Sequence, residues 1–376
     1  MPDVRIEDQF NWKLRQLSVE LHSMISKPVW VILAIAPSVT VMACDGGAAS
    51  PSGSSSTGGA GAGGSSMSGT VGSTTSTTSD PVELAGDADY AGTMVSDPTT
   101  IYWVTDSKVL AVPKLGGAVT TLASRQNYPV GLAVDDTDVY WTVGDFGAAS
   151  VMRVPNGGGT PSTLVDGQSE AGVIAVDDVS VFWADGSTIQ KLPKAGGSSV
   201  SIVSVSNVSS MHLKADRLYV ATIDWTQQAA GGIFSCDLDG NDVLPIATAI
   251  DGTSRGCSAL AVDDTHAYCT ASKGTSPGVS TVISCPLDGS GPTEIAGIHS
   301  YCISAAIAVD SSTIFWSEDP SSVEAVCGVH SVSELGGQPA DVFLYGMYAG
   351  MVIDESHLFV ARNWPGGGSS VFRVPK

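Results

Sequence analysis

The chain has 376 residues and carries 17 Lys and Arg against 38 Asp and Glu, which gives a formal net charge of −21. This acidity argues against nucleic-acid binding, which needs a basic surface. Charged residues make up only 15% of the chain and glycines number 43, a composition that favours β-structure with many turns over helices.

Residues 1–43 are predicted to be a targeting segment. From Met24 the sequence has a single positive charge at Lys27, an apolar stretch over residues 29–36, and a break at Pro37. This order is typical of a signal peptide. The apolar stretch is too short to span a membrane, which takes about 20 residues. Met24 is the expected true start, and a long region preceding the apolar stretch is the alternative.

The end of this segment resembles the lipobox of bacterial lipoproteins, with Val41 and Ala43 ahead of Cys44; Met42 is an unusual occupant of its position. The resemblance implies cleavage before Cys44 and lipidation of its thiol, and hence a lipoprotein of the bacterial cell envelope, periplasm-facing or at the cell surface. Ordinary export with cleavage nearby and an uncleaved anchor are the alternatives. Residues 44–79 are the lipidated cysteine and a tether rich in Gly, Ser and Thr, with a reach of roughly 30 Å.

Residues 80–376 contain one unit repeated seven times. Each copy has a corner aspartate followed by an aromatic residue, at intervals of roughly 40 residues, which is the period of a β-propeller blade. The corner aspartates and aromatic residues of the seven copies are Asp97 and Tyr102, Asp135 and Tyr140, Asp177 and Phe182, Asp216 and Tyr219, Asp263 and Tyr268, Asp310 and Phe315, and Asp354 and Phe359.

Each copy is predicted to form four antiparallel strands, A to D. The second copy gives them as residues 131–135, the segment around Tyr140, residues 151–155 and residues 162–165, with a glycine-rich turn between C and D. The last copy ends after its strand C, and residues 82–85 stand before the first copy at the spacing of a strand D. We therefore predict an all-β, seven-bladed β-propeller, closed by an N-terminal strand that joins three C-terminal strands.

The strand B segments Ile101 to Asp106 (IYWVTD) and Val139 to Thr142 (VYWT) loosely resemble YWTD-type propeller repeats of the lipoprotein-receptor kind. That family has six blades and this chain has seven, so no ligand residue can be transferred. A tethered bacterial lipoprotein with a propeller head is the nearer resemblance, and it implies a binding or scaffold module.

The acidic stretch Asp135 to Val143 (DDTDVYWTV) could form either a metal site or a corner between two strands. Similar corners recur in nearly every copy, and Asp and Ser favour turns by accepting backbone hydrogen bonds, so a structural corner is expected. No Cys-x-x-Cys, His-x-His or phosphate-loop pattern occurs. We therefore expect no metal, no cofactor and no catalytic residue.

Six cysteines follow Cys44, and export with an even count favours disulfides. Fifteen connectivities are open. Strand positions suggest Cys269–Cys285 and Cys302–Cys327, which would leave Cys236 with Cys257 near opposite ends of their strands.

The variable loops indicate the working face. The A–B and C–D connections are nearly constant in length, whereas the B–C and D–A loops vary, and insertions on one face of a repeat protein usually mark its binding face. Aromatic or charged residues gather in these loops and are the candidate ligand-binding residues: Tyr90, Tyr128, Phe146, Glu170, Trp225, Arg255, Tyr301, Tyr348 and Trp364. Packing of these aromatics against one another is the alternative.

The sequence thus predicts a lipid-anchored, monomeric propeller head that binds a protein, a peptide or a saccharide without catalysis. The alternative is a propeller enzyme of the lyase or hydrolase type, with Glu170 or His299 as an acid or base at the channel mouth. His212, in a strand A, is expected to be a packed or water-bonded residue.

Overall fold

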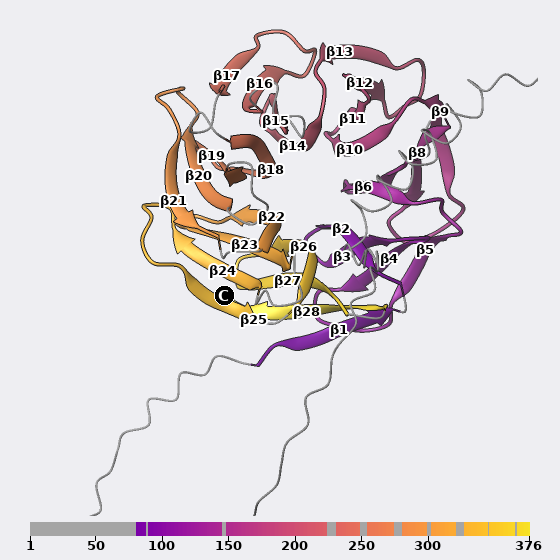
Figure 1. Ribbon diagram of the computed structural model, residues 1–376. Coiled ribbons are helices and arrows are strands. Elements are labelled where there is room, and N and C mark those ends of the chain that lie inside the picture. The colour runs from indigo at the N-terminus through magenta and orange to yellow at the C-terminus, as the bar shows by residue number, and fades with distance from the viewer. Residues whose placement is uncertain are drawn as a thin grey trace, which may run out of the picture. The chain divides into compact units, whose positions relative to one another are not determined.

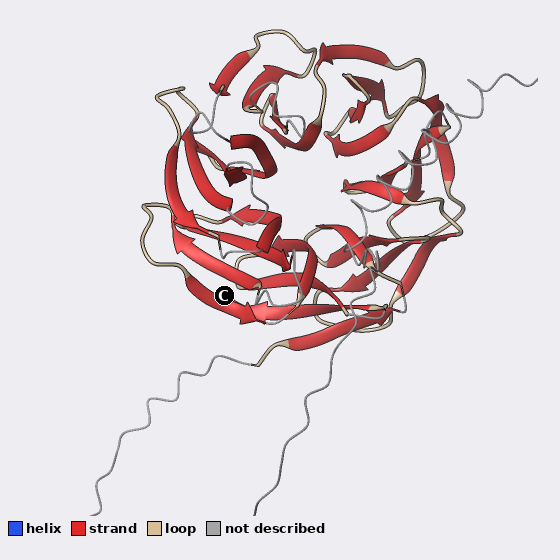
Figure 2. Ribbon diagram, viewed as in Figure 1, coloured by secondary structure: helices blue, strands red, loops and turns tan. Residues whose placement is uncertain are grey.

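The computed structural model describes residues 80–87, 89–144, 148–223, 231–248, 254–273, 280–298, 302–320, 327–344, 346–364 and 367–376. The chain divides into two units, Met1–Thr78 and Ser79–Lys376. All described residues belong to the second unit, and every regular element among them is a strand (Figure 2).

The strands form seven four-stranded antiparallel sheets arranged as the blades of a ring (Figure 1). Strands β2, β6, β10, β14, β18, β22 and β26 lie innermost, and each blade runs outward from them. Blades 1 to 3 comprise β2 (Ala91–Ser96), β3 (Thr100–Thr105), β4 (Lys108–Pro113) and β5 (Thr120–Ser124); β6 (Pro129–Val134), β7 (Asp138–Val143), β8 (Ala149–Pro155) and β9 (Ser162–Gln168); and β10 (Ala171–Val176), β11 (Ser180–Asp185), β12 (Thr188–Pro193) and β13 (Val200–Ser204).

Blades 4 to 6 comprise β14 (Val208–Lys214), β15 (Arg217–Thr222), β16 (Ile233–Asp237) and β17 (Leu244–Ala247); β18 (Ser254–Val262), β19 (His266–Lys273), β20 (Ser280–Pro286) and β21 (Thr293–Gly297); and β22 (Cys302–Val309), β23 (Thr313–Pro320), β24 (Gly328–Ser333) and β25 (Ala340–Leu344). Blade 7 comprises β26 (Met347–Ile353), β27 (His357–Asn363), β28 (Ser369–Pro375) and β1 (Val82–Asp87).

The closure of the ring by β1 confirms the predicted architecture. Strand β1 pairs with β28 from Val82 opposite Arg373 to Asp87 opposite Ser369, so the last blade takes its outer strand from the start of the unit. Blade 7 is also tied to blade 1, because Asn363 Oδ1 accepts a hydrogen bond from Ala91 N at 2.9 Å. The outermost strand of blade 7 thus covers an edge of β28 that would otherwise be unpaired.

The two aromatic residues of strand B pack on opposite sides of their blade. Side chains alternate along a strand, so Tyr140 packs between blades 2 and 3, whereas Trp141 packs between blades 1 and 2. Both are at most 1% exposed. The same alternation supplies the core at each of the seven blade interfaces, one apolar cluster to each.

The acidic corner of blade 2 is a structural turn, as predicted. Asp135 Oδ1 accepts hydrogen bonds from the backbone N–H groups of Thr137 and Asp138 at 2.7 and 2.8 Å. Its Oδ2 accepts from Tyr140 Oη at 3.0 Å. The same bonds recur at Asp97 and Asp263. The carboxylate thus fixes both the turn and the buried ring of strand B.

A lysine from the neighbouring blade completes several of these corners. Lys194 Nζ lies 2.5 Å from Asp135 Oδ2 and 5.8 Å from the centre of the Tyr140 ring. Lys376 lies in the same way on Asp310, at 2.7 Å, and on the Phe315 ring. The corner aspartate therefore also links adjacent blades.

The structure corrects the predicted disulfide Cys269–Cys285. Cys269 is bonded to Cys257, with their Cα atoms 5.6 Å apart, and Cys285 is a free, buried thiol. Cys269 lies opposite Ile283 and Cys285 opposite Ala267, so these two cysteines are diagonal neighbours. Diagonal pairs stand about 7–8 Å apart, beyond the usual span of a disulfide.

Among the remaining cysteines, Cys236 also differs from the expected pattern. Cys236 is a free, buried thiol, so it does not pair with Cys257. Cys236 and Cys285 occupy the strand C position that other blades fill with a buried Val or Leu, and they serve as small apolar residues. Burial raises the pKa of the Cys285 thiol to about 12. Cys327 is in a disulfide, and the Cys302 side chain lies outside the described part, so the Cys302–Cys327 pairing stays a prediction.

Candidate functional site

The two ends of the blades differ in what their polar side chains do. We call the end with the A–B and C–D connections the corner face, and the end with the B–C and D–A loops the loop-rich face. On the corner face, the carboxylates of Asp135, Asp310 and Asp354 contact lysines at 2.5–3.9 Å. Their charges are therefore used to hold blades together.

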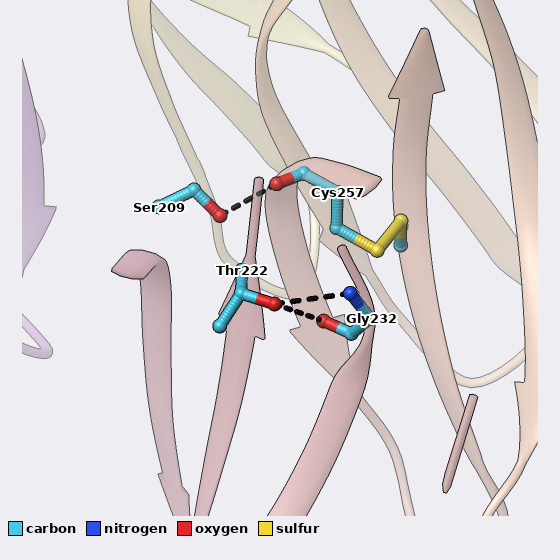
Figure 3. Close-up of a disulfide and its surroundings, with 5 residues drawn as sticks. Ser209, Thr222, Gly232 and Cys257 are labelled. Atoms are coloured by element: carbon cyan, nitrogen blue, oxygen red, sulfur yellow. Dashed lines mark hydrogen bonds between the residues drawn. A yellow bond between two sulfur atoms is a disulfide. The ribbon is translucent and has the colours of Figure 1, made fainter. Parts of the chain in front are cut away.

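The inner strands are joined to one another near the loop-rich face. Each of the seven inner strands has a register shift near its start. Ser209 Oγ donates to Cys257 O of the next blade at 2.5 Å, close to the disulfide (Figure 3). From β7, the second strand of blade 2, Thr142 Oγ1 donates to Gly172 O of the inner strand β10 at 2.7 Å. These hydroxyls stabilise the ring and are not available to a ligand.

Glycine permits this close approach at one point of the ring. A Cβ on Gly131 would stand 2.6 Å from Gly172 O of the neighbouring blade, a contact that real Cβ atoms do not make. The Gly131 N–H donates to Thr142 Oγ1 at 2.8 Å, so this hydroxyl bridges the two blades.

Several predicted ligand-binding residues lie outside the described part: Phe146, Trp225, Tyr301, the side chain of Arg255, and His299. The structure therefore brings no evidence on them, and they stay predictions.

Three predicted residues are placed along the D–A loops. Tyr90 is half-buried at the entrance to β2. Tyr128 is 41% exposed and has a left-handed backbone with φ of 51°. Glu170 is exposed and its N–H donates to Asp185 Oδ1 at 2.8 Å. They precede the inner strands of three different blades.

The structure does bring together two predicted residues in blade 7. Trp364 follows β27 and is 37% exposed, and its Nε1 donates to Ser370 Oγ at 3.2 Å. The guanidinium of Arg362 lies over the Trp364 ring, 4.0 Å from its centre. Directly opposite Arg362 on β26 lies Tyr348.

Tyr348 differs from its predicted position. It lies within β26 rather than in a loop, is 1% exposed, and packs in the core between blades 6 and 7, with Phe343 edge-on at 6.0 Å. Burial raises its pKa to about 12. The sequence does not predict Arg362 as a site residue, because a single arginine at the end of a strand forms no recognisable motif.

A second polar group, buried in blade 6, was also not foreseen. Glu318 and His330 are 0% and 1% exposed, and His330 Nε2 lies 3.3 Å from Glu318 Oε2. Asp341 Oδ1 lies 2.9 Å from His330 Nδ1, and Trp316 Nε1 donates to Glu318 Oε1 at 3.0 Å. His330 faces Trp316 where blade 1 has Leu110 facing Trp103.

The protonation of His330 should make the stability of the protein depend on pH. Burial lowers the pKa of His330, but Glu318, followed by Asp341, raises it more, so that it lies above the ordinary 6.5. A raised pKa stabilises the fold fully below pH 6.5, and this contribution disappears as the pH rises through the folded-state value. We expect His330→Gln to cost about 3–5 kcal/mol at pH 6, because Glu318 stays buried without a cation, and less at pH 8.

Urea unfolding at the two pH values measures this difference, with His266→Gln at a half-buried corner of blade 5 as the control. An equal loss at both pH values would contradict a charged His330.

Within the described residues, no group of three or more His, Cys, Asp or Glu side chains is arranged to hold a metal ion. The same part of the chain holds no apolar helix of membrane-spanning length.

Comparison with known proteins supports the fold. No protein-family model matches the sequence, and no curated protein matches it. An oligogalacturonate lyase solved in complex with manganese is similar, with 11% identity and a TM-score of 0.58, over 77% of this chain and 90% of that one. The β-propeller domain of the Trilobed protease from Pyrococcus furiosus gives 9% identity and a TM-score of 0.52, over 76% and 98%. The latter is described as having an open velcro topology, whereas β1 closes the ring here.

A chain in a nidogen–laminin complex has 17% identity over 65% of this chain and 92% of that one, but its TM-score of 0.48 is too low to support an argument. The chain spans 34% of a matching chain of the tricorn protease. At these identities the comparisons show a β-propeller and nothing finer.

Proposed function

We propose that this protein is a lipid-anchored β-propeller of the bacterial cell envelope that binds a partner through its loop-rich face and does not act as an enzyme. The observation that carries the proposal is the exposure of Tyr128 and of the Arg362–Trp364 stack on that face. Tyr, Trp and Arg are the residues that contribute most to binding in protein interfaces. The lysines and aspartates of the corner face, by contrast, hold neighbouring blades together.

Exposed apolar residues also occur on the corner face. Leu115 and Leu335 are 88% and 90% exposed in two C–D turns. They stand singly in blades 1 and 6, and single apolar residues on a surface need no partner. They offer a matched control for the loop-rich face.

The binding proposal is tested by comparing two double variants of the full chain. Tyr128→Ser with Trp364→Ser removes exposed rings from the loop-rich face, and Leu115→Ser with Leu335→Ser removes exposed side chains from the corner face. We expect chemical cross-linking in intact cells to lose its partner bands with the first variant alone. Loss with the second variant alone would contradict the choice of face.

The anchoring proposal rests on the lipobox-like residues that end at Cys44. A single acyl chain binds membranes weakly, so stable anchoring needs several. We expect radiolabelled palmitate to label the wild-type chain and not Cys44→Ser. Unchanged labelling of the variant would remove the lipoprotein from the proposal and leave the binding face untouched.

A further inference from the structure

Three buried polar atoms without a hydrogen-bond partner lie between blades 6 and 7: Ser317 Oγ, Tyr348 Oη and Arg362 Nε. Tyr348 and Arg362 are directly opposite each other on β26 and β27, and cross-strand partners extend side by side from one face of a sheet. Both belong to the side of blade 7 that packs on blade 6. Tyr348 and Val360 share a core cluster with Phe315 of blade 6, and Arg362 stands two residues after Val360 on β27, so it extends to the same side.

Ser317 reaches the same interface from blade 6. It stands two residues beyond Phe315 on β23 and therefore extends to the same side, and β23 packs against β26. The Ser317 side chain is 0% exposed.

All three groups can donate a hydrogen bond, and one of them is charged. A buried donor without an acceptor costs free energy, and native proteins rarely leave one without a reason. A set of three at one interface matches a ligand that brings acceptors, and the positive charge of Arg362 selects a negatively charged one. A carboxylate fits this arrangement, because its two oxygens accept several hydrogen bonds at once.

The stack of Arg362 on Trp364 forms the exposed part of this group. A cation–π contact uses the flat face of the guanidinium and leaves its N–H groups free in the plane. The two Nη atoms have no acceptor among the described residues and are not among the buried unpartnered atoms, so they reach the solvent. Lysines such as Lys108 and Lys194 each contact a carboxylate of the protein, whereas Arg362 contacts none of those described.

The position of Arg362 depends on a glycine. A Cβ on Gly346 would lie 2.6 Å from Arg362 Nε and 2.9 Å from its Cδ. Gly346 thus leaves the space that the arginine stem fills, and any side chain there would displace the guanidinium.

We propose that Arg362, Trp364, Tyr348 and Ser317 form a binding subsite for a ligand that carries one carboxylate beside a ring. This deepens the proposed function and rests on it, because the subsite lies on the loop-rich face. Arg362 binds the carboxylate, the indole of Trp364 packs against the ring, and the hydroxyls of Tyr348 and Ser317 donate to the bound group. The net charge of −21 repels ligands with many negative charges, so a single carboxylate is favoured.

Calorimetric titration of the full chain tests the proposal with two pairs of probes. One pair is glucuronate and glucose, and the other is N-acetylphenylalanine and its amide. We expect at least one carboxylate to bind and its neutral partner not to bind. The pair that shows the difference identifies the source as an acidic sugar or a peptide C-terminus.

Two matched variants identify the residue. Arg362→Met should weaken carboxylate binding by about tenfold or more, since a charge-assisted pair is lost. Arg125→Met, which removes an exposed charge from a D–A loop of the same face, should leave the affinity unchanged. Equal affinities of the two variants, or equal binding of carboxylates and neutral partners, would overturn the subsite.

Measurements of thermal stability distinguish a role of these residues in carboxylate binding from a structural role. Tyr348→Phe removes only a buried hydroxyl without a partner, so we expect weaker carboxylate binding with a thermal midpoint that is unchanged or higher. Gly346→Ala should weaken binding by displacing Arg362, and it serves if Arg362→Met does not fold. If no probe binds while cross-linking still depends on the loop-rich face, the subsite is wrong and the proposed function stands.

Discussion

Removal of β1 should abolish the cooperative folding of the propeller. A chain that begins at Asp89 lacks Val82–Asp87 and leaves the outer edge of β28 unpaired. It also loses the packing of Ala85 in the core between blades 7 and 1 and the contact between Lys108 Nζ and Asp87 Oδ1 at 3.0 Å. We expect a loss of about 5 kcal/mol or more, comparable with the whole folding free energy of a typical domain, about 5–15 kcal/mol.

Thermal unfolding followed by circular dichroism measures the effect, with a chain that begins at Ser79 as the control. A synthetic peptide of residues 80–88, added in excess, should restore a cooperative melting transition to the shortened chain, because it binds the folded state alone. A shortened chain that melts like the control would show that the ring does not depend on its N-terminal strand.

The sequence determines the ring because each blade repeats the same requirements. A four-stranded sheet with an apolar face on both sides must bury both against neighbours. Seven copies of the strand B pair, an aromatic residue followed by Trp, Val or Cys, imply seven such interfaces. The closure of the ring by the N-terminal strand can also be predicted from the sequence, since Leu84 stands 13 residues before Asp97, as Leu164 stands before Asp177. These are local periodicities, and the local sequence is enough to recognise them.

The disulfide and the blade 7 group were beyond sequence reasoning, because both depend on registers. Cys257 meets Cys269 through two register shifts in β18, which no residue pattern announces. The role of Arg362 depends on its contacts with Gly346, Tyr348 and Trp364, which lie on the neighbouring strand or in adjoining loops. The candidate aromatics were selected by loop position alone, so Tyr348 was assigned to a loop although it lies within a strand.

The acidic corner DDTDVYWTV permits a comparison between two neighbouring carboxylates. Asp135→Ala should destabilise the protein by about 2–4 kcal/mol, since it leaves two backbone donors, the Tyr140 hydroxyl and Lys194 without their acceptor. Asp136→Ala, one residue away and exposed, should change the stability by less than about 0.5 kcal/mol. Urea unfolding at pH 7 measures both, and a metal or catalytic role for the corner would not predict this difference in stability.

Lowering the pH should remove the stabilisation that the Asp135 carboxylate contributes. Burial raises the pKa of Asp135, but the ion pair with Lys194 and the hydrogen bonds from Asp138, Thr137 and Tyr140 lower it further, so that it lies well below 3.8. A carboxyl group whose pKa is lowered by folding stabilises the fold above its unfolded-state pKa. That stabilisation is lost as the pH falls through its folded-state pKa. Wild-type protein should therefore lose stability more steeply than Asp135→Ala below about pH 4. Parallel curves for the two chains would mean that Lys194 and the turn do not depend on the charge of this aspartate.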